Sequence, residues 1–250
     1  MVGGGSEAIR LRQFFVEEKP AIGQYSRLDK EDSFHLLRVL RKEEGAEILL
    51  AYEGMQFLGK LHTIEGEAFV MVEKQLREKD NRGRLVLCQG VGKSQKTELV
   101  LKHATECGID GFIPIQTDRS VSNLSKKYEG KRKRFEKIAE EAAKQSNRRL
   151  IPEIGDLWMV DDLVENLEDE DVLVVCYEDE EERDIMDLSF SGEGTVYLLI
   201  GAEGGLAPRE IELLEDKGIF VTMGDSILRT ETAGIVASYV LRRLMERGKD

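Results

Sequence analysis

Apolar residues in the first third of the chain form short runs that are separated by turn residues. Residues 33–45 have helical spacing, with Ser33 as a candidate N-cap and Gly45 beyond the end. The polar segment 74–84 is predicted to be a linker, because it contains few apolar side chains. The other runs have the length and composition of strands and together predict a small β-barrel; they lie at residues 12–16, 46–52, 57–64 and 67–74.

The pattern changes after residue 84, where continuous apolar runs alternate with amphipathic segments. Buried strands are predicted at residues 85–91, 111–117, 172–178, 195–201 and 218–224. Helices are predicted at residues 94–107, 131–145, 208–217 and 231–246. Pro208 suits the first position of its helix, and Gly218 suits the C′ position after it. Such alternation predicts an α/β domain with a mostly parallel sheet, so we expect domains at residues 1–76 and 77–250.

Composition limits the location and the metal content that we expect. Hydrophobic residues make up 41% of the 250 residues and charged residues 34%, an ordinary balance for a globular protein with a charged surface. No apolar run reaches membrane-spanning length, and the N-terminus lacks the apolar core of a secretion signal. The three cysteines are widely spaced and match neither a disulfide framework nor a zinc site. We therefore expect a cytoplasmic protein without a membrane partner or a bound metal.

The formal net charge of −13, taken alone, argues against a nucleic-acid partner. The charges are unevenly distributed, however. Acidic residues crowd between residues 156 and 193, whereas basic residues crowd between residues 119 and 149 and again near the N-terminus. Because the local field matters more than the net charge for attracting a polyanion, both basic groups are candidate RNA-binding surfaces. On charge alone, ordinary solvated faces explain them equally well.

The first candidate for chemistry is the glycine-rich segment LLIGAEGGLAPREIE at residues 198–212. It joins a predicted buried strand to a predicted helix, and ligands bind at such strand ends in open α/β sheets. The segment lacks both the Gly-Lys-Ser/Thr element of a P-loop and the GxGxxG dinucleotide fingerprint. Glu203 within the loop disfavours a phosphate and allows a cationic or hydroxyl-bearing ligand. An ordinary tight turn explains the glycines alone equally well.

Two further segments combine polar side chains with a predicted helix end. MGDSILRTETAG, at residues 223–234, precedes the last helix, and a plain helix start with Thr230 as N-cap is its simplest explanation. EEAAKQSNRRLIP, at residues 140–152, carries Gln145 and Arg148 at a spacing that predicts one shared helix face. A basic helix C-terminus that complements the helix dipole explains this second segment without any function.

The order of the segments is more specific than any one of them. The chain contains, in sequence, HLLRVLR, GKSQKTELVLKHATECGIDGFIPIQTDRS, AEEAAKQSNR, LLIGAEGGLAPREI and MGDSILRTETA. In this order they resemble the ribosomal RNA small-subunit methyltransferase E family, which belongs to the SPOUT class of knotted methyltransferases. The resemblance extends from Arg12 to about Leu244. One departure is Ala202, where the family commonly has proline.

The resemblance implies a fold, a reaction and a set of partners. The fold is an N-terminal PUA-like β-barrel that binds RNA, followed by a SPOUT domain with a trefoil knot, in a homodimer whose active site is completed across the interface. The reaction transfers a methyl group from S-adenosylmethionine to N3 of a uridine in small-subunit (16S) ribosomal RNA, either as RNA or within the 30S subunit. The cofactor pocket carried over from the family comprises Gly201, Glu203, Gly205, Met223, Gly224, Ile227, Leu228, Arg229 and Thr232.

Uridine N3 carries a proton at neutral pH, so a base must remove it or a cation must stabilise the anion that forms. Arg229 is the first candidate for the cation and Arg148 the second. Glu231 is a candidate base, although the N-terminus of its helix favours the ionised, weakly basic carboxylate. The residues expected on the RNA face are Arg10, Arg12, His35, Arg38, Arg41, Lys93, Lys96 and Arg119, together with Arg148.

Three other interpretations stay open at the level of sequence. A related knotted enzyme would act on transfer RNA or on a ribose hydroxyl, because the identity of the base does not follow from first principles. A non-enzymatic RNA-binding assembly factor would carry a degenerate pocket, and the intact Gly201, Glu203, Gly205 and Arg229 weigh against it. A nucleotide-phosphate-binding protein is disfavoured by the missing P-loop lysine.

Overall fold

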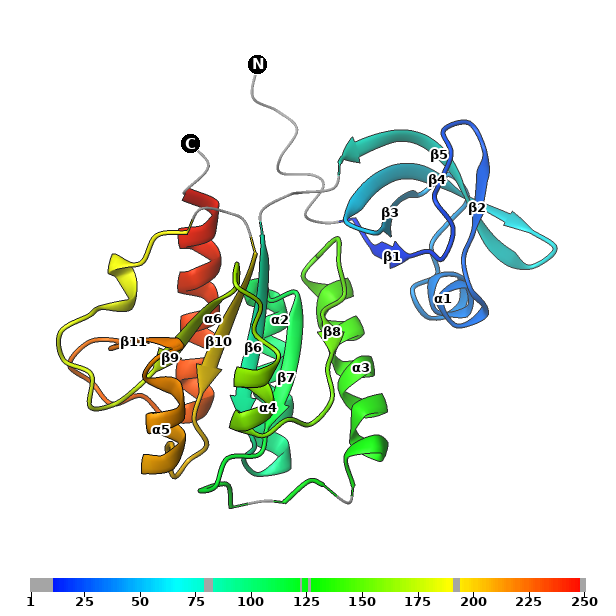
Figure 1. Ribbon diagram of the computed structural model, residues 1–250. Coiled ribbons are helices and arrows are strands. Elements are labelled where there is room, and N and C mark those ends of the chain that lie inside the picture. Colours follow the sequence, from blue (N-terminus) through cyan, green and yellow to red (C-terminus); the bar gives the residue numbers. More distant parts are fainter. Residues whose placement is uncertain (1–10, 79–82, 122, 126, 191–193, 248–250) are drawn as a thin grey trace. The chain divides into compact units, whose positions relative to one another are not determined.

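The computed structural model describes residues 11–78, 83–121, 123–125, 127–190 and 194–247. The chain divides into two compact units (Figure 1). The first takes Met1–Asp80 together with Ala143–Leu150, and the second takes Asn81–Ala142 together with Ile151–Asp250. A segment from the middle of the chain therefore groups with the N-terminal unit.

The first unit is built on a curved five-stranded sheet (Figure 1) with the order β1-β3-β4-β5-β2. All neighbouring strands are antiparallel except β1 and β3. The pairing of β4 with β5 is irregular beside Phe57 and Gly59, and such bulges bend a sheet around its core. A Cβ at Gly59 would lie 2.4 Å from the Met71 carbonyl oxygen, so this close approach requires glycine. The strands are β1 (Gln13–Phe15), β2 (Tyr25–Arg27), β3 (Glu47–Tyr52), β4 (Met55–Ile64) and β5 (Glu67–Arg77).

The helical segment of this unit differs from the sequence prediction at both ends. Helix α1 (Lys30–Phe34) continues into a π-helical turn, His35–Val39, and stops well before Gly45. Its N-cap is Asp29, whose carboxylate accepts a hydrogen bond from the Asp32 backbone N–H at 2.7 Å. The prediction of Ser33 as N-cap is wrong, because its hydroxyl accepts a hydrogen bond from the Ala68 N–H instead. The Ser33 hydroxyl therefore bonds to strand β5, although the local sequence predicted that it would cap the helix.

The predicted linker at residues 74–84 is wrong at both ends, and its residues 79–82 lie outside the described part of the chain. Strand β5 continues to Arg77, and β6 begins at Arg84. The polar residues of β5 pair with β4, for example Lys74 with Leu58. One face of an antiparallel strand can remain in water, so a polar composition does not exclude ladder hydrogen bonds.

The second unit contains a six-stranded sheet in which all neighbouring strands are parallel, with the order β11-β9-β10-β6-β7-β8. This confirms the predicted α/β class and the mostly parallel sheet. The strands are β6 (Arg84–Gly90), β7 (Gly111–Ile115), β8 (Glu153–Ile154), β9 (Val172–Cys176), β10 (Thr195–Ile200) and β11 (Gly218–Val221). Their central members are apolar almost throughout, because helices cover both faces of the sheet.

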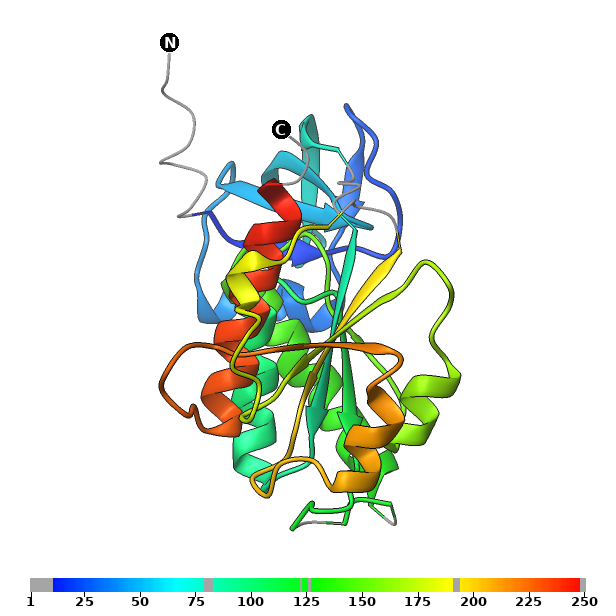
Figure 2. The ribbon, with the colours of Figure 1, turned by 60° about the vertical axis from the view of Figure 1, so that its left-hand side comes forward.

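Helices lie in two layers on either side of this sheet (Figure 2). One layer contains α2 (Ser94–Cys107) and α6 (Thr230–Arg247), which pack against each other, and the start of α3 (Tyr128–Gln145) contributes Phe135 to the same core. The other layer contains α4 (Val160–Glu165) and α5 (Pro208–Leu214). A short 3₁₀ turn, Ile185–Asp187, lies between β9 and β10 in the chain. None of the described helices is long and apolar enough to cross a membrane.

Several helix ends differ from their predicted positions. Helix α5 begins at Pro208 as predicted but ends at Leu214, and Gly218 opens strand β11 instead of following the helix. Helix α3 ends at Gln145, and Asn147 adopts a positive φ of 51°. Arg148 therefore does not share a helix face with Gln145, contrary to the spacing argument. The short elements β2, β8 and α4 were missed, since each is too short to show a period in the sequence.

Candidate active site

The loops that follow the parallel strands meet at the carboxyl edge of the sheet. Neighbouring parallel strands point the same way, so the segments after β9, β10 and β11 emerge side by side. We call residues 177–179, 201–205 and 222–229 the carboxyl-edge loops. Such an edge is where open α/β sheets bind ligands.

The glycine-rich loop at residues 201–205 folds tightly on itself. Ala202 and Gly205 form an isolated bridge, in which the Gly205 N–H donates to the Ala202 carbonyl at 2.9 Å. Gly205 has φ +69°, and a Cβ there would lie 2.7 Å from Oε1 of Glu178 in the neighbouring loop. A Cβ at Gly90, at the end of β6, would lie 2.2 Å from the Ala202 nitrogen. Both positions require glycine, because a Cβ there would collide with a neighbouring loop.

Two polar contacts fix this loop from the side of β7. The Arg119 guanidinium donates to the Gly204 carbonyl oxygen at 3.3 Å. The carboxylate of Glu210, which is 1% exposed, accepts the Asp118 N–H at 3.0 Å and the Ala207 N–H at 2.7 Å. A buried carboxylate that accepts two main-chain donors is well compensated, so it ties the start of α5 to the segment after β7.

A buried hydrogen-bond chain joins the glycine-rich loop to the start of α6. The Thr230 hydroxyl donates to the Gly201 carbonyl oxygen at 2.6 Å and accepts Nε2 of Gln89 at 2.9 Å. Thr230 is the first residue of α6, and its side chain is committed to these tertiary contacts. A plain helix start with Thr230 as N-cap therefore does not describe this segment. Strands β6 and β10 and helix α6 are held together at one point.

An ion-pair cluster lies beside the same loop. The Lys96 ammonium is 3.2 Å from Oε2 of Glu231 and 3.6 Å from Oε1 of Glu203. The Glu203 carboxylate sits against Gly92, where a Cβ would be 2.8 Å from both of its oxygens. A hydrogen bond from its own backbone N–H, together with Lys96, lowers the pKa of Glu231. The cluster therefore combines an ionised Glu231 with a second carboxylate that glycine accommodates.

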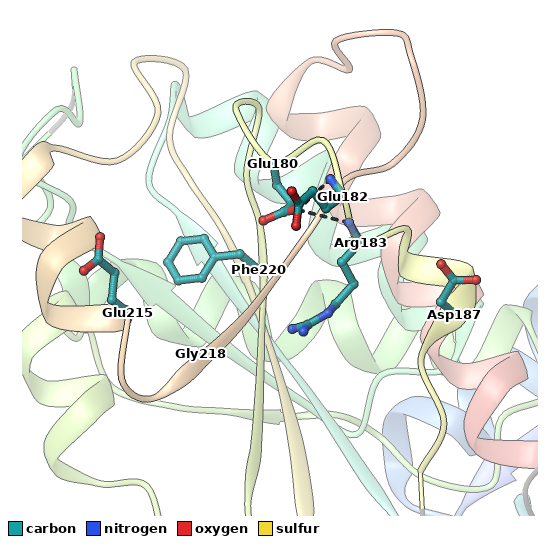
Figure 3. A pocket seen from close by; sticks show the side chains of 7 residues that line it. All are labelled: Glu180, Glu182, Arg183, Asp187, Glu215, Gly218 and Phe220. Atoms are coloured by element: carbon teal, nitrogen blue, oxygen red, sulfur yellow. Dashed lines mark hydrogen bonds between the residues drawn. The ribbon is translucent and has the colours of Figure 1, made fainter.

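A separate hollow of about 560 Å³ lies at the β11 edge of the sheet (Figure 3). Figure 3 shows the Phe220 ring and the Arg183 guanidinium extending toward the same space. The remaining lining residues are Glu180, Glu182, Asp187, Glu215 and Gly218. The hollow contains none of the residues predicted for the cofactor pocket, so the carboxyl-edge loops remain the candidate site.

Comparison with known proteins assigns the family. A family model described as an RNA methyltransferase domain matches residues 78–242. The ribosomal RNA small subunit methyltransferase E of Bacillus subtilis is 31% identical over 240 residues, which cover 92% of this chain and 92% of that protein. The protein of the same description from Mycobacterium tuberculosis is 30% identical over 237 residues, covering 90% of this chain and 88% of that protein.

The chain belongs to the ribosomal RNA small subunit methyltransferase E family. Solved structures agree with this assignment. A methyltransferase structure from Legionella pneumophila, in complex with S-adenosylmethionine, is 25% identical with a TM-score of 0.75, covering 94% of this chain and 98% of that one. The family member from Neisseria gonorrhoeae, bound to S-adenosylmethionine, has a TM-score of 0.81 over 94% of this chain and 98% of that one. At 21% identity, the latter shows a shared fold.

The residues expected to bind cofactor in this family member lie on the carboxyl-edge loops or at the start of α6. Gly201 and Gly205 are in contact, and Glu203 reaches Glu231 through Lys96. Met223 and Leu228 are half-buried against the core under α6, whereas Gly224 has φ +96° and open space around it. Ile227, at 86% exposed, and Thr232 face solvent. Their role in binding stays a prediction.

The candidate catalytic residues fall in different units. Arg229 and Glu231 belong to the second unit, and the Arg229 guanidinium is exposed. Arg148 is 8% exposed and belongs to the segment that groups with the first unit, where its carbonyl oxygen accepts Nε2 of Gln13. The predicted roles of all three stay predictions.

The candidate RNA-binding residues are mostly exposed. Arg12, His35, Arg38 and Arg41 are exposed on the first unit, and Lys93 and Arg119 on the second. Arg10 lies outside the described residues. Lys96 differs from the others, because its ammonium is engaged by two carboxylates.

Sequence reasoning missed several residues that shape the site. Gln89 carried a usable signal, since it is a polar residue inside an otherwise apolar strand. Gly90 and Gly92 carried no such signal. Each must be glycine because residues 202 and 203, which are distant in sequence, lie against it in the fold. Among the residues that the structure describes, no group of histidine, cysteine, aspartate and glutamate side chains could hold a metal ion.

Proposed function

We propose that this chain transfers a methyl group from S-adenosylmethionine to N3 of a uridine in small-subunit ribosomal RNA. One observation carries the proposal: the glycine-rich loop meets the start of α6 through Thr230 and Gly201, in a member of this methyltransferase family. The substrate implies a cytoplasmic location, where ribosomes are assembled.

The residues of the carboxyl-edge loops fit a nucleoside held by main-chain groups. Gly201 and Gly205 let main-chain groups of the loop approach each other closely, and the exposed Glu178 carboxylate beside Gly205 can accept hydrogen bonds from ribose hydroxyls. The half-buried Met223 and Leu228 offer apolar surface for a purine ring. When bound, S-adenosylmethionine supplies a methyl group that its sulfonium already activates.

The protein's own contribution is to position the uridine and to control its charge. Correct placement of two reactants supplies on the order of 7–11 kcal/mol toward the barrier. Arg229, whose exposed guanidinium follows the β11 loop, would stabilise the uridine anion as N3 loses its proton. N3 lies on the Watson–Crick edge, so the target base must be unpaired or flipped out while it reacts.

Binding of the RNA would use exposed cations on both units. Arg12, before β1, and His35, Arg38 and Arg41, in and after the π-helical turn, would give the first unit, a PUA-like barrel in this proposal, an RNA-binding surface. Lys93 and Arg119 would contact RNA beside the carboxyl-edge loops. Phosphate contacts of this kind make binding strongly dependent on salt.

We also infer that the second unit has the trefoil knot of the SPOUT class. Strand β11 lies at the edge of the sheet, next to β9. The chain that follows it returns past β9 to the end of β10, where the Thr230 hydroxyl donates a hydrogen bond to the Gly201 carbonyl. On the way, Thr222 pairs with Arg183 and Ile185 of the connection between β9 and β10. Ile185 in turn is buried in the core beneath α6. Passage of the returning chain inside this connection accounts for all three contacts, although such threading is very rare.

A homodimer is the second structural element of the proposal. Helices α2 and α6 pack together, yet this layer exposes three large apolar side chains: Leu99 at 45%, Val236 at 40% and Tyr239 at 54%. A second copy would cover this apolar surface. In such a dimer, as the family resemblance implies, the active site would be completed across the interface.

Labelled methyl transfer to three RNAs tests the proposed function. Small ribosomal subunits that lack the modification, naked small-subunit RNA and transfer RNA are each incubated with the protein and labelled S-adenosylmethionine. We expect label in the small-subunit RNA and none in transfer RNA. Label in transfer RNA alone would overturn the substrate, and no label in any RNA would overturn the proposed function.

A further inference from the structure

The two carboxylates of the ion-pair cluster have different surroundings, although they share one lysine. Glu231 is bonded to Lys96 at 3.2 Å, and its side chain is 15% exposed. Glu203 is 3.6 Å from the same ammonium, beyond ordinary hydrogen-bond length, and its side chain is 26% exposed. Within the described part of the chain, we find no hydrogen bond that the Glu203 carboxylate accepts. Its oxygens are therefore the more available of the two for a new donor.

Glu203 and Glu231 also differ in how well they can accept a proton. Glu231 accepts a hydrogen bond from its own backbone N–H and from Lys96, and its pKa is lowered, so its carboxylate is a poor proton acceptor. Glu203 lies on the glycine-rich loop itself, two residues after Gly201. Glu203 is thus part of the carboxyl-edge loops, whereas the Glu231 carboxylate already accepts donors at the start of α6.

Two features keep Glu203 in place. Gly92 leaves a space that its carboxylate fills, since a Cβ there would be 2.8 Å from each oxygen. The Lys96 ammonium, in the first turn of α2, attracts the Glu203 carboxylate. The same ammonium is held by an ion pair with Glu231 at the start of α6. Around Glu203, the described residues thus include Lys96 of α2, which contacts it, Glu231 of α6, which contacts Lys96, and Arg119, which bonds the neighbouring Gly204 carbonyl.

We propose that Glu203 accepts the N3 proton of the target uridine and that Lys96 is a positioning residue, which holds Glu203 through its anchor on Glu231. The inference rests on the proposed function, and it gives Lys96 a role other than RNA contact. In the step, the N3–H bond breaks and its electron pair stays on N3. The proton forms an O–H bond with the Glu203 carboxylate. The N3 pair forms the bond to the methyl carbon, and the pair of the broken carbon–sulfur bond goes to sulfur.

Glu203→Gln tests the proton acceptor, because the amide keeps the shape of the side chain and removes the base. Loss of a general base costs on the order of 10²–10⁴-fold in the rate of methyl transfer near neutral pH. We expect this loss in single-turnover rates at saturating S-adenosylmethionine and subunit. We also expect the deficit to shrink as pH rises, because N3 then ionises in solution without a protein base. Glu203 also belongs to the predicted cofactor pocket, so calorimetry with S-adenosylhomocysteine measures any change in cofactor affinity separately, and the rates are compared only at saturating S-adenosylmethionine.

Lys96→Met and Lys96→Arg test the positioning role. Lys96→Met should lower kcat with little change in KM for the subunit, and Lys96→Arg should restore most of the rate, since a guanidinium can still reach both carboxylates. The pKa of Glu231 is a readout that needs neither cofactor nor RNA, and it is measured by NMR titration of the Glu231 carboxyl carbon. This pKa should rise in Lys96→Met, because one of the groups that lowers it is gone.

Matched controls lie on α5, which follows the glycine-rich loop, and on α2. Glu212→Gln removes an exposed carboxylate from α5, and Lys102→Met removes an exposed ammonium from α2. Both should transfer methyl groups at the wild-type rate. Transfer by Glu203→Gln at the wild-type rate, or a deficit that is the same at every pH, would overturn the proton-acceptor role. A Lys96→Met variant that loses subunit binding and keeps kcat would overturn the positioning role. Failure of wild type to transfer any methyl group would instead overturn the proposed function.

Discussion

Replacement of Gly234 by alanine tests the packing of α6 on the sheet. Gly234 is buried in the second turn of α6, over Gln89 of β6. An ideal Cβ would lie 2.4 Å from Oε1 of Gln89 and 3.1 Å from Cγ1 of Val100. In an exposed helix the same change would stabilise the fold by about 1 kcal/mol, because alanine has the higher helix propensity. Here the two effects oppose each other, and their magnitudes decide the sign.

The contact should outweigh the propensity. Gln89 is 1% exposed, and its Nε2 is bonded to the Thr230 hydroxyl at 2.9 Å, so its side chain cannot turn into solvent. If it moves aside, a buried donor loses its partner, which costs about 1–3 kcal/mol. Pressure on Val100 adds an overpacking cost of about 1–3 kcal/mol. After subtraction of the helix gain, we expect a net loss of about 3 kcal/mol, or about 6–12 °C in Tm.

Urea unfolding followed by tryptophan fluorescence measures this loss. The chain has a single tryptophan, Trp158. It forms a β-bridge with Ile115 of β7, so its fluorescence reports on the second unit. The matched control is Gly130→Ala in α3, where nothing lies within 4 Å of the added Cβ. This control should gain up to about 1 kcal/mol. A Gly234→Ala variant as stable as wild type, or more stable, would refute the packing argument.

Three further predictions follow from individual contacts. Thr230→Val removes the bond to the Gly201 carbonyl, so calorimetry should show about tenfold weaker binding of S-adenosylhomocysteine, equivalent to about 1.4 kcal/mol. Arg242→Met removes the ion pair that the buried guanidinium makes with Asp110 and its bond to the Gly108 carbonyl, and chemical denaturation should show a loss of about 3–5 kcal/mol. The lowered pKa of Glu231 means that its ionised form stabilises the fold above pH 4.5, its unfolded value, and that this contribution disappears as pH falls through the folded value. Urea midpoints of wild type and Glu231→Gln should therefore differ at neutral pH and converge in acid.

The class of the fold followed from the sequence because its main determinants are local. Apolar runs such as residues 85–91 and 195–201 are long enough to mark buried parallel strands, and strands β6 and β10 confirm both to within one residue at each end. The errors fall where tertiary contacts override local preference. Ser33 pairs with Ala68 rather than capping a helix, and polar residues after Lys74 extend β5 because β4 offers ladder partners. No local pattern contains that information.

Some features of the candidate site were also visible in the sequence, whereas others appear only in the folded chain. The order of the sequence blocks identified the family and drew attention to the glycine-rich loop and to residues 223–234. The pairing of Glu203 with Glu231 through Lys96 could not be predicted, because the three residues are far apart in sequence and meet only when α2, β10 and α6 converge. Gln89 was visible as a polar residue in an apolar strand, but its partner Thr230 was visible only in the folded chain.

The central claim concerns the atom that receives the methyl group, and mass spectrometry of the product tests it most directly. Small subunits that lack the modification are treated with the protein and S-adenosylmethionine, and their RNA is digested to nucleosides. The account predicts a single new nucleoside, N3-methyluridine, at one position in the small-subunit RNA. A methyl group on a ribose hydroxyl or on a different base would contradict it.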